Sequence, residues 1–107
     1  MLHHVALPDA YLAGHAYTPA DYEQDGFIHL CTPDQLQTVL DIYYKDIRPL
    51  HLLYLNGDIS DVKWEEASSG ELFPHLYRPI EVEDVVQVEA LNDIIVHPVP
   101  AETQADH

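Results

Sequence analysis

The sequence predicts one α+β domain, and three observations support this fold class. The chain has 107 residues, the usual length of one domain. Hydrophobic residues make up 47% of it, which is enough for one modest core. One strong helical pattern lies among several short apolar segments, in the order strand, short helix, strand, long helix and then several strands.

The first part of the chain predicts two strands joined by less regular structure. Residues 2–7 form a short apolar segment closed by Pro8, as is typical of a strand. Residues 8–16 predict one or two helical turns, and the polar residues 17–25 predict a loop. Residues 26–31 predict the second strand.

The clearest local pattern begins at Thr32. Thr32 and Gln35 have the spacing of a capping box, and Pro33 occupies the first helical turn. Apolar residues then recur at helical spacing, at Leu36, Val39, Leu40 and Tyr43. We therefore expect one long helix over residues 33–45.

The second half of the chain predicts mainly strands. Residues 50–55 alternate little in polarity and predict a central strand. Residues 73–77 contain Pro74 and predict a loop or a short edge element. Further strand candidates are 62–67, 80–82, 85–88 and 94–96. We expect the domain to span residues 1–97 and the polar tail, 98–107, to be mobile.

The charge balance restricts the partners. Nineteen acidic residues face four Lys and Arg, a formal charge of −15, which disfavours nucleic acid and anionic membranes. No apolar segment approaches the roughly 20 residues of a membrane span, and the start lacks the layout of a secretory signal. Cys31 is the single cysteine, which excludes an intramolecular disulfide. We therefore expect a cytoplasmic protein.

Three histidines, His4, His29 and His75, lie in strand-like or aromatic contexts. A neutral imidazole both donates and accepts a hydrogen bond, so it can bind a pair of hydroxyls such as a ribose diol. It can also act as a general acid or base near neutral pH. The alternative is a partly buried structural histidine bonded to a backbone carbonyl.

Aromatic and acidic residues accompany these histidines. Glu65 could orient or deprotonate a bound hydroxyl; alternatively Trp64 belongs to the core and Glu65 to the solvent. Phe73 and Tyr77 flank His75, where they would wall a small-molecule pocket or anchor a loop on the core.

A metal site is a rival interpretation. His29, His4, His75 and Glu65 could form a tetrahedral set, but no HxxxH or HExxH spacing supports it, so we expect no metal. For Cys31 we expect a small core residue, because a reactive thiolate needs electropositive surroundings.

Three sequence blocks resemble the DUF952 family when they are taken in order. They are LHHVA at residues 2–6, DGFIHLCTP at 25–33, and WE at 64–65 followed by GELFPHLY at 70–77. The resemblance covers about residues 2–89. That family has been grouped with the ADP-ribosyltransferase superfamily, near the RNA 2′-phosphotransferases. The resemblance thus implies a split β-sheet of the ADP-ribosyltransferase fold with one long helix packed on it.

The same resemblance implies a site for NAD or ADP-ribose, and an NAD-using transferase or glycohydrolase. His4 matches the position that contacts the nicotinamide ribose, His29 matches the second block, and His75 is the candidate for the third position. The charge disfavours an RNA substrate, but a single pyrophosphate can be held by a helix start and one arginine. Thr32 and Arg78 are candidates on this ground, although Arg78 is not a motif residue.

Two other functional classes remain open, an inactive nucleotide-binding module and a His-rich metal-binding or structural domain. The candidate catalytic residues are His4, His29, His75 and Glu65. The candidate ligand-binding residues are Thr32, Trp64, Phe73, Tyr77 and Arg78.

Overall fold

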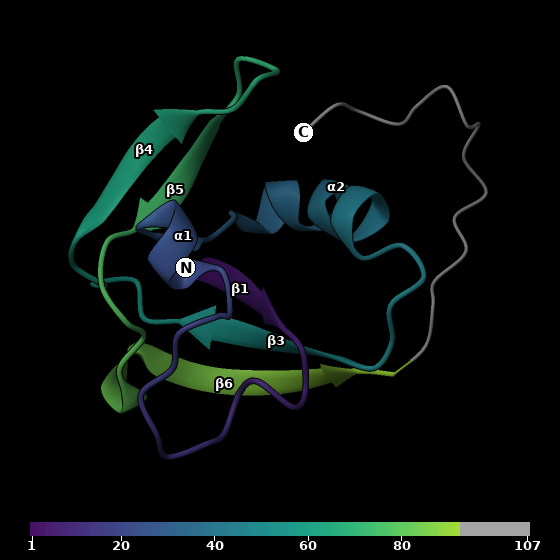
Figure 1. Ribbon diagram of the computed structural model, residues 1–107, viewed down its shortest axis with the longest axis vertical. Coiled ribbons are helices and arrows are strands. Elements are labelled where there is room, and N and C mark those ends of the chain that lie inside the picture. The colour runs from purple at the N-terminus through teal and green to yellow at the C-terminus, as the bar shows by residue number, and fades with distance from the viewer. Residues whose placement is uncertain (93–107) are drawn as a thin grey trace.

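Two antiparallel three-stranded sheets and one 11-residue helix dominate the computed structural model, which describes residues 1–92 (Figure 1). The first sheet has the order β1 (Leu2–Ala6), β3 (Leu50–Leu55) and β6 (Val85–Leu91). The second has the order β2 (Ile28–His29), β5 (Leu72–Leu76) and β4 (Val62–Glu66). The prediction of one α+β domain is confirmed. The expected strand at 94–96 and the tail, 98–107, lie outside the described residues.

The two sheets are joined at the open edge of β1. His3 and Cys31 exchange backbone hydrogen bonds of 2.8 and 2.9 Å, so the segment that leaves β2 pairs briefly with β1. A second isolated bridge joins Tyr17 to Ile80. Together these bridges hold the N-terminal loop and the second sheet against the first sheet.

Helix α2 (Pro33–Tyr43) begins as the sequence predicts. The Thr32 hydroxyl accepts a hydrogen bond from the Gln35 backbone at 3.2 Å, and the Gln35 side chain accepts one from the Thr32 backbone at 3.0 Å. The Gln35 amide also donates to the carbonyl of Leu72 at 2.8 Å, which ties the helix start to β5. The expectation of one long helix over residues 33–45 is met only in part, because α2 ends at Tyr43 and a second helix, the short α1 (Tyr22–Asp25), accompanies it.

Two predictions for residues 8–25 are wrong in their detail. Residues 8–16 form separate turns rather than helical turns, and Gly14 there adopts a left-handed φ of 85°. Helix α1 lies in the segment predicted as a loop, and it ends at Gly26, whose backbone N–H donates to Tyr22. A four-residue helix leaves no periodic pattern in the sequence, so polarity alone was misleading.

The prediction of a loop or edge element at 73–77 is also wrong, because β5 is the central strand of its sheet. Pro74 is tolerated there for a geometric reason. Its carbonyl accepts from the backbone of Leu30 at 3.0 Å, and in an extended strand the nitrogen of the same residue faces the same side. The missing N–H therefore costs only the reciprocal bond to Leu30, and β2 stops at His29.

Residues 80–82, predicted as strand material, also need a correction. Ile80 pairs only with Tyr17, and Val82–Asp84 form a short 3-10 helix, η1, before β6. The central place of β3 in the first sheet is as predicted.

The core consists of two clusters. One lies between the sheets and includes Ile28, Leu53 and Leu76, and the other lies between the first sheet and α2 and includes Val5 and Leu40. Each fully buried aliphatic side chain stabilises the fold by about 1.5–3 kcal/mol.

Within residues 1–92, none of the helices has the length and apolar character needed to cross a membrane.

Candidate functional site

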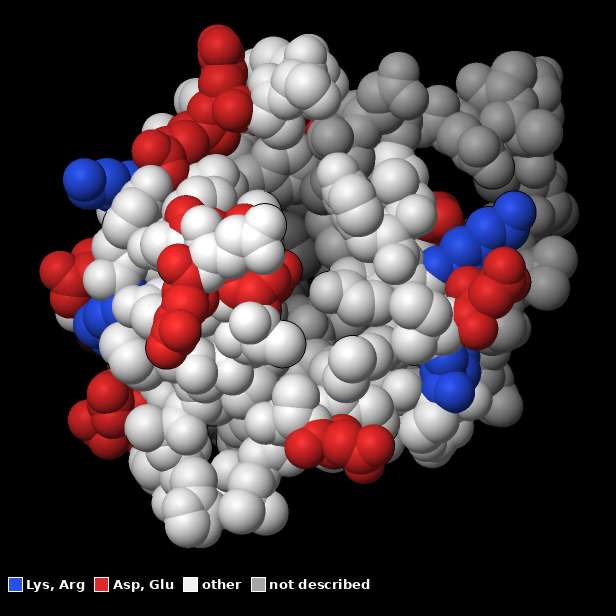
Figure 2. Space-filling model, viewed as in Figure 1, with Lys and Arg blue, Asp and Glu red and all other residues white. Residues whose placement is uncertain are grey.

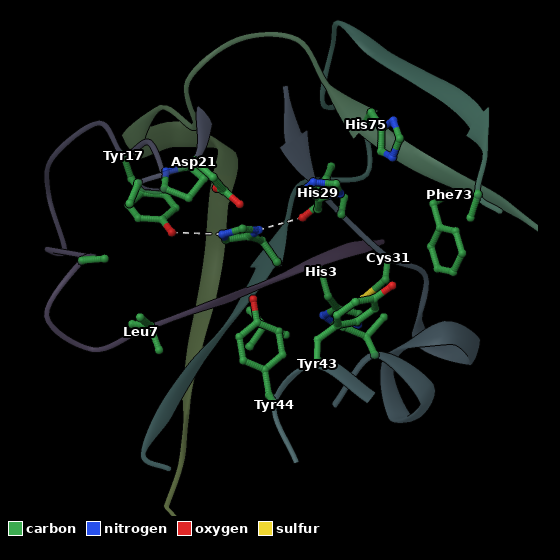
Figure 3. A pocket seen from close by; sticks show the side chains of 18 residues that line it. His3, Leu7, Tyr17, Asp21, His29, Cys31, Tyr43, Tyr44, Phe73 and His75 are labelled. Carbon is green, nitrogen blue, oxygen red and sulfur yellow. Dashed lines mark hydrogen bonds between the residues drawn. The ribbon is translucent and has the colours of Figure 1, made fainter. Parts of the chain in front are cut away.

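A cavity of about 700 Å³ lies between β1, α2 and the face of the second sheet that bears Phe73 and His75 (Figure 3). This volume is typical of a small-molecule site. Its walls are mainly apolar and aromatic, and include Val5, Cys31, Val39, Tyr43, Tyr44 and Phe73. Its polar side chains are those of His3, His4, Tyr17, Asp21, His29 and His75. The three histidines singled out in the sequence, and Phe73, thus come together in one cavity.

His4 is held by hydrogen bonds at both ring nitrogens. Its Nδ1 lies 2.8 Å from the carbonyl oxygen of His29, so Nδ1 carries the proton and donates it. Its Nε2 lies 3.1 Å from the Tyr17 hydroxyl and therefore accepts a hydrogen bond from Tyr17. Burial lowers the pKa of His4 to about 4, which keeps this ring neutral. Because both nitrogens are occupied, neither is available to a ribose hydroxyl.

His29 and His75 lie side by side on the face of the second sheet opposite to Ile28 and Leu76, and this face lines the cavity. They are cross-strand partners in the β2–β5 pair, and their ring centroids are 5.3 Å apart. Phe27 stacks on His75 with a centroid distance of 4.0 Å and an interplanar angle of 17°. The side chain of His29 is 57% exposed and that of His75 only 14%, so His75 is the more enclosed of the two.

A carboxylate holds the ring of His75. Nδ1 of His75 donates to Oε1 of Glu65 at 2.7 Å, which leaves Nε2 with a lone pair when the ring is neutral. Tyr77 donates its hydroxyl proton to the same carboxylate oxygen. The bonds from Tyr77 and His75 lower the pKa of Glu65. Neither Glu65 nor Tyr77 lines the cavity itself, so both act behind His75.

Three predicted ligand-binding residues are engaged elsewhere. Thr32 caps α2 with its hydroxyl. Trp64 lies between two residues of β4 whose side chains share the face of His75, so it points to the opposite face, where it is 51% exposed. Trp64 is therefore neither a cavity wall nor a core residue.

Arg78 is the third of these residues. Its guanidinium binds both oxygens of Asp84, at 2.6 and 3.2 Å, and reaches Asp61 at 3.2 Å. It does not line the cavity. The arginine expected to hold a pyrophosphate therefore anchors η1 instead.

Sequence reasoning missed Tyr17, Asp21 and Tyr44. The first two lie in a segment predicted as a loop, and long-range contacts of Tyr17 with Ile80 and His4 bring that segment to the cavity. Tyr44 immediately follows α2 and points into the same space (Figure 3). No local pattern in the sequence distinguishes these residues.

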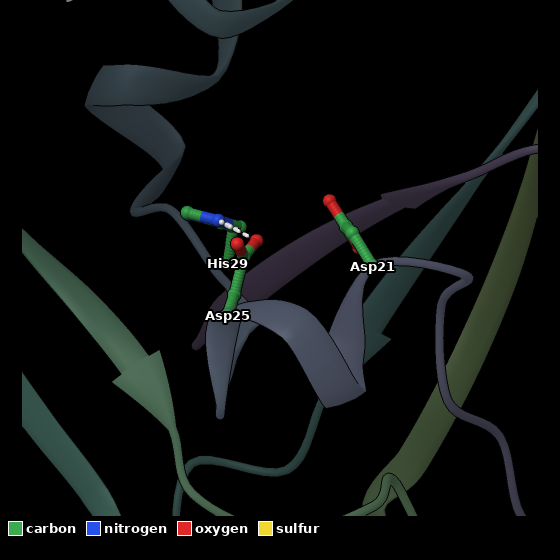
Figure 4. A group of neighbouring side chains, drawn as sticks. All are labelled: Asp21, Asp25 and His29. Atoms are coloured by element: carbon green, nitrogen blue, oxygen red, sulfur yellow. Dashed lines mark hydrogen bonds and ion pairs between the residues drawn. The ribbon is translucent and has the colours of Figure 1, made fainter.

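Acidic ligands for a metal lie near the cavity mouth. Ligand atoms of Asp21, Asp25 and His29 lie within 4.8 Å of one another, and all three residues are exposed (Figure 4). Nε2 of His29 already donates to Asp25 at 3.1 Å. Of the tetrahedral set considered from the sequence, this group contains only His29. His4 cannot serve as a metal ligand, because both of its ring nitrogens are hydrogen-bonded.

Cys31 is buried at the cavity wall. Burial raises the pKa of its thiol to about 12, so the sulfur stays protonated and is a poor nucleophile at neutral pH. Its position agrees with the expected role as a small core residue.

Comparison with solved structures gives one protein in two forms. The crystal structure of protein CC0527 from Caulobacter crescentus has a TM-score of 0.73, with 30% identity over 83% of each chain. A double mutant of CC0527 gives the same values. No curated protein matches the chain. The sequence model of the family described as "Protein of unknown function (DUF952)" matches residues 6–88, and the chain belongs to this family.

Proposed function

We propose that this protein binds a small organic molecule in the cavity between its two sheets and α2. The observation that supports this proposal is the cavity itself, about 700 Å³ in a domain of 107 residues. Close packing is the norm in protein interiors, so a domain of this size rarely leaves such a volume without a use. Apolar walls with a few polar groups at one end are typical of ligand sites.

The polar groups at that end define how the molecule would be held. The Tyr17 hydroxyl donates its proton to His4, so its oxygen remains an acceptor for a ligand donor. Nε2 of His75 is an acceptor when the ring is neutral. The Tyr44 and Phe73 rings supply apolar contact. A planar molecule with hydrogen-bond donors suits this arrangement.

NAD and ADP-ribose remain predictions from the family resemblance, and this cavity suits them poorly. The described lining residues include no Lys or Arg that could pair with a pyrophosphate. His4, which the resemblance assigned to the nucleotide, is bonded to other protein groups. The same holds for Thr32 and Arg78, the candidates for its pyrophosphate. We therefore expect such nucleotides to bind weakly, on the order of 0.1–1 mM. The formal charge of −15 likewise argues against nucleic acid as a partner.

A change that fills the cavity tests the binding proposal. Val39 lines the cavity from α2, so Val39→Trp would place a large ring in it. Gln37→Trp on the same helix is the matched control, because Gln37 is exposed and does not line the cavity. Amide spectra titrated with nicotinamide, indole and NAD should show shifts at Tyr44 and Phe73 in the native chain and the control, and none in Val39→Trp. Equal shifts in both variants would contradict the proposal.

The pair of Glu65 and His75 favours a second candidate function, proton transfer to or from the bound molecule. A carboxylate behind an imidazole fixes its tautomer and stabilises the imidazolium that forms when Nε2 accepts a proton. His75 is held further by stacking on Phe27. Such a ring is prepared to act as a general base on a water molecule or hydroxyl in the cavity.

Hydrolysis of 4-nitrophenyl acetate tests this second function. Nε2 of His75 would take a proton from water as its oxygen attacks the ester carbon, and acetate and 4-nitrophenol would leave. We expect Glu65→Gln and His75→Gln to lower the rate about a hundredfold. His15→Gln is the control, since His15 is exposed and away from the cavity. A rate that is unchanged in His75→Gln would exclude the general-base role for this reaction.

A further inference from the structure

The charges around the cavity are one-sided. Asp21 lines it, and no Lys or Arg does so among the described residues. Arg78 is bound by Asp84 and Asp61, and the Lys63 ammonium lies 4.9 Å over the Tyr77 ring. Figure 2 shows acidic side chains beside the hollow at the centre of one face, whereas Lys and Arg lie toward the edges. A ligand anion would therefore meet no lysine or arginine among the described lining residues, whereas a ligand cation would meet the carboxylate of Asp21.

The carboxylate of Asp21 faces the aromatic part of the cavity. In the close-up it lies between Tyr17 and His29 (Figure 3), and it lines the same cavity as Tyr44. Burial raises the pKa of Tyr44, and the negative charge of Asp21 raises it further. Burial likewise raises the pKa of Tyr17, and the charges of Tyr44 and Asp21 raise it further. The field of Asp21 thus reaches both rings. Among the described residues, no side chain donates a hydrogen bond or forms an ion pair with Asp21.

We infer that the cavity selects an organic cation, namely an amine or quaternary ammonium group carried on a ring or short alkyl chain. The ammonium group would lie beside Asp21 and against the faces of Tyr17 and Tyr44, and the apolar part would extend toward Val39 and Phe73. Aromatic faces attract such cations through the negative charge of their π-systems, most strongly where water is excluded. This inference depends on the proposed binding function and specifies its ligand class.

Three probes with the same ring and different charge test the inference. Benzyltrimethylammonium is the cation, benzyl alcohol the neutral molecule and benzoate the anion. Each is titrated into the isotope-labelled full chain at low salt, and shifts of cavity amides give the dissociation constants. We expect the cation to bind about tenfold or more tightly than benzyl alcohol, with benzoate weakest. Added salt should weaken the cation most.

One substitution isolates the carboxylate. Asp21→Asn removes its charge with little change of size, and should weaken benzyltrimethylammonium about tenfold while leaving benzyl alcohol within about twofold. Asp58→Asn is the matched control, since Asp58 is exposed and does not line the cavity. It should leave all three constants within about twofold.

The remaining outcomes distinguish a failure of the cation preference from a failure of the proposal that the cavity binds a small molecule. Equal affinities for cation and alcohol, both lost in Val39→Trp, would overturn the cation preference and leave the binding proposal standing. Shifts from none of the three probes would count against both. Because Asp21 also belongs to the group with Asp25 and His29, zinc is titrated alone. Micromolar zinc binding that Asp21→Asn and Asp25→Asn each abolish would assign Asp21 to a metal and overturn the inference.

Discussion

The hydroxyl of Tyr17 lies 3.1 Å from Nε2 of His4, and this buried hydrogen bond joins two segments 13 residues apart in the chain. The other ring nitrogen of His4 donates to the carbonyl of His29. One imidazole therefore fastens both the N-terminal loop and β2 to β1, next to the cavity. The histidine that the family resemblance placed on a ligand is thus bonded to the protein on both sides.

The first prediction concerns this bond. Tyr17→Phe should lower the free energy of unfolding by about 1–3 kcal/mol, because Nε2 of His4 would be left buried without a donor. Tyr17 is 5% exposed, so water has little access to replace the hydroxyl. Tyr22→Phe is the control, since the Tyr22 hydroxyl makes no hydrogen bond within the described residues. Urea titrations of both variants provide the measurement, and an equal loss in the two would contradict the prediction.

The second prediction concerns pH. The folded-state pKa of His4 is about 4, below its ordinary 6.5, because burial disfavours the charged ring. The unfolded chain therefore binds more protons below pH 6.5, and stability should decline as the pH falls from about 6.5 to 4. The full loss is about 3 kcal/mol, at roughly 1.4 kcal/mol per pKa unit.

The variant His4→Gln separates this contribution from that of other groups. A glutamine amide can both donate and accept but does not titrate. Urea titrations at several pH values should show a smaller decline for His4→Gln than for the native chain between pH 6.5 and 4. An identical decline would show that His4 does not contribute.

Local chemistry predicted part of the fold, and the physical reason differs by element. Thr32 and Gln35 satisfy each other's backbone groups within one turn, so the start of α2 depends on neighbours in sequence alone. The central strand that contains Pro74 could not be predicted. Proline is tolerated there because the side on which its missing N–H falls faces Leu30, where only one hydrogen bond is lost. That side depends on which strand pairs with it, which is a tertiary property.

The candidate site divides in the same way. The blocks that contain His29 and His75 could be recognised from the sequence, whereas the two residues share a face because they are cross-strand partners. Tyr17 and Asp21 could not be found, because a long-range bridge positions their loop. Trp64 shares its face of the sheet with Val62 and Leu76, which pack in the core, but Trp64 itself is 51% exposed. Alternation predicts which residues share a face, but not how far along a strand the core covers that face.

The third prediction concerns the carboxylate behind His75. Hydrogen bonds from Tyr77 and His75 hold the pKa of Glu65 below its ordinary value. Tyr77→Phe removes the larger of the two contributions, so the pKa of Glu65 should rise while the cavity remains formed. Carbon-detected NMR titration of the Glu65 carboxyl follows this change. A pKa of Glu65 that stays the same in Tyr77→Phe would show that the hydroxyl does not bond to it in solution.

The last prediction concerns Arg78, which the sequence placed near a ligand and the structure places on Asp84. A planar guanidinium satisfies both carboxylate oxygens of Asp84 and also reaches Asp61, whereas a lysine ammonium can form only part of this set. Arg78→Lys should therefore lower the free energy of unfolding by about 1–2 kcal/mol, although the charge is retained.

The same variant should not alter binding in the cavity, because Arg78 does not line it. Thermal or urea unfolding measures the first effect, and titration with benzyltrimethylammonium and ADP-ribose measures the second, with Val39→Trp as the variant that does lose binding. If Arg78→Lys weakened ADP-ribose alone, the guanidinium would be serving a phosphate, and the assignment of Arg78 to the anchoring of η1 would have to be abandoned.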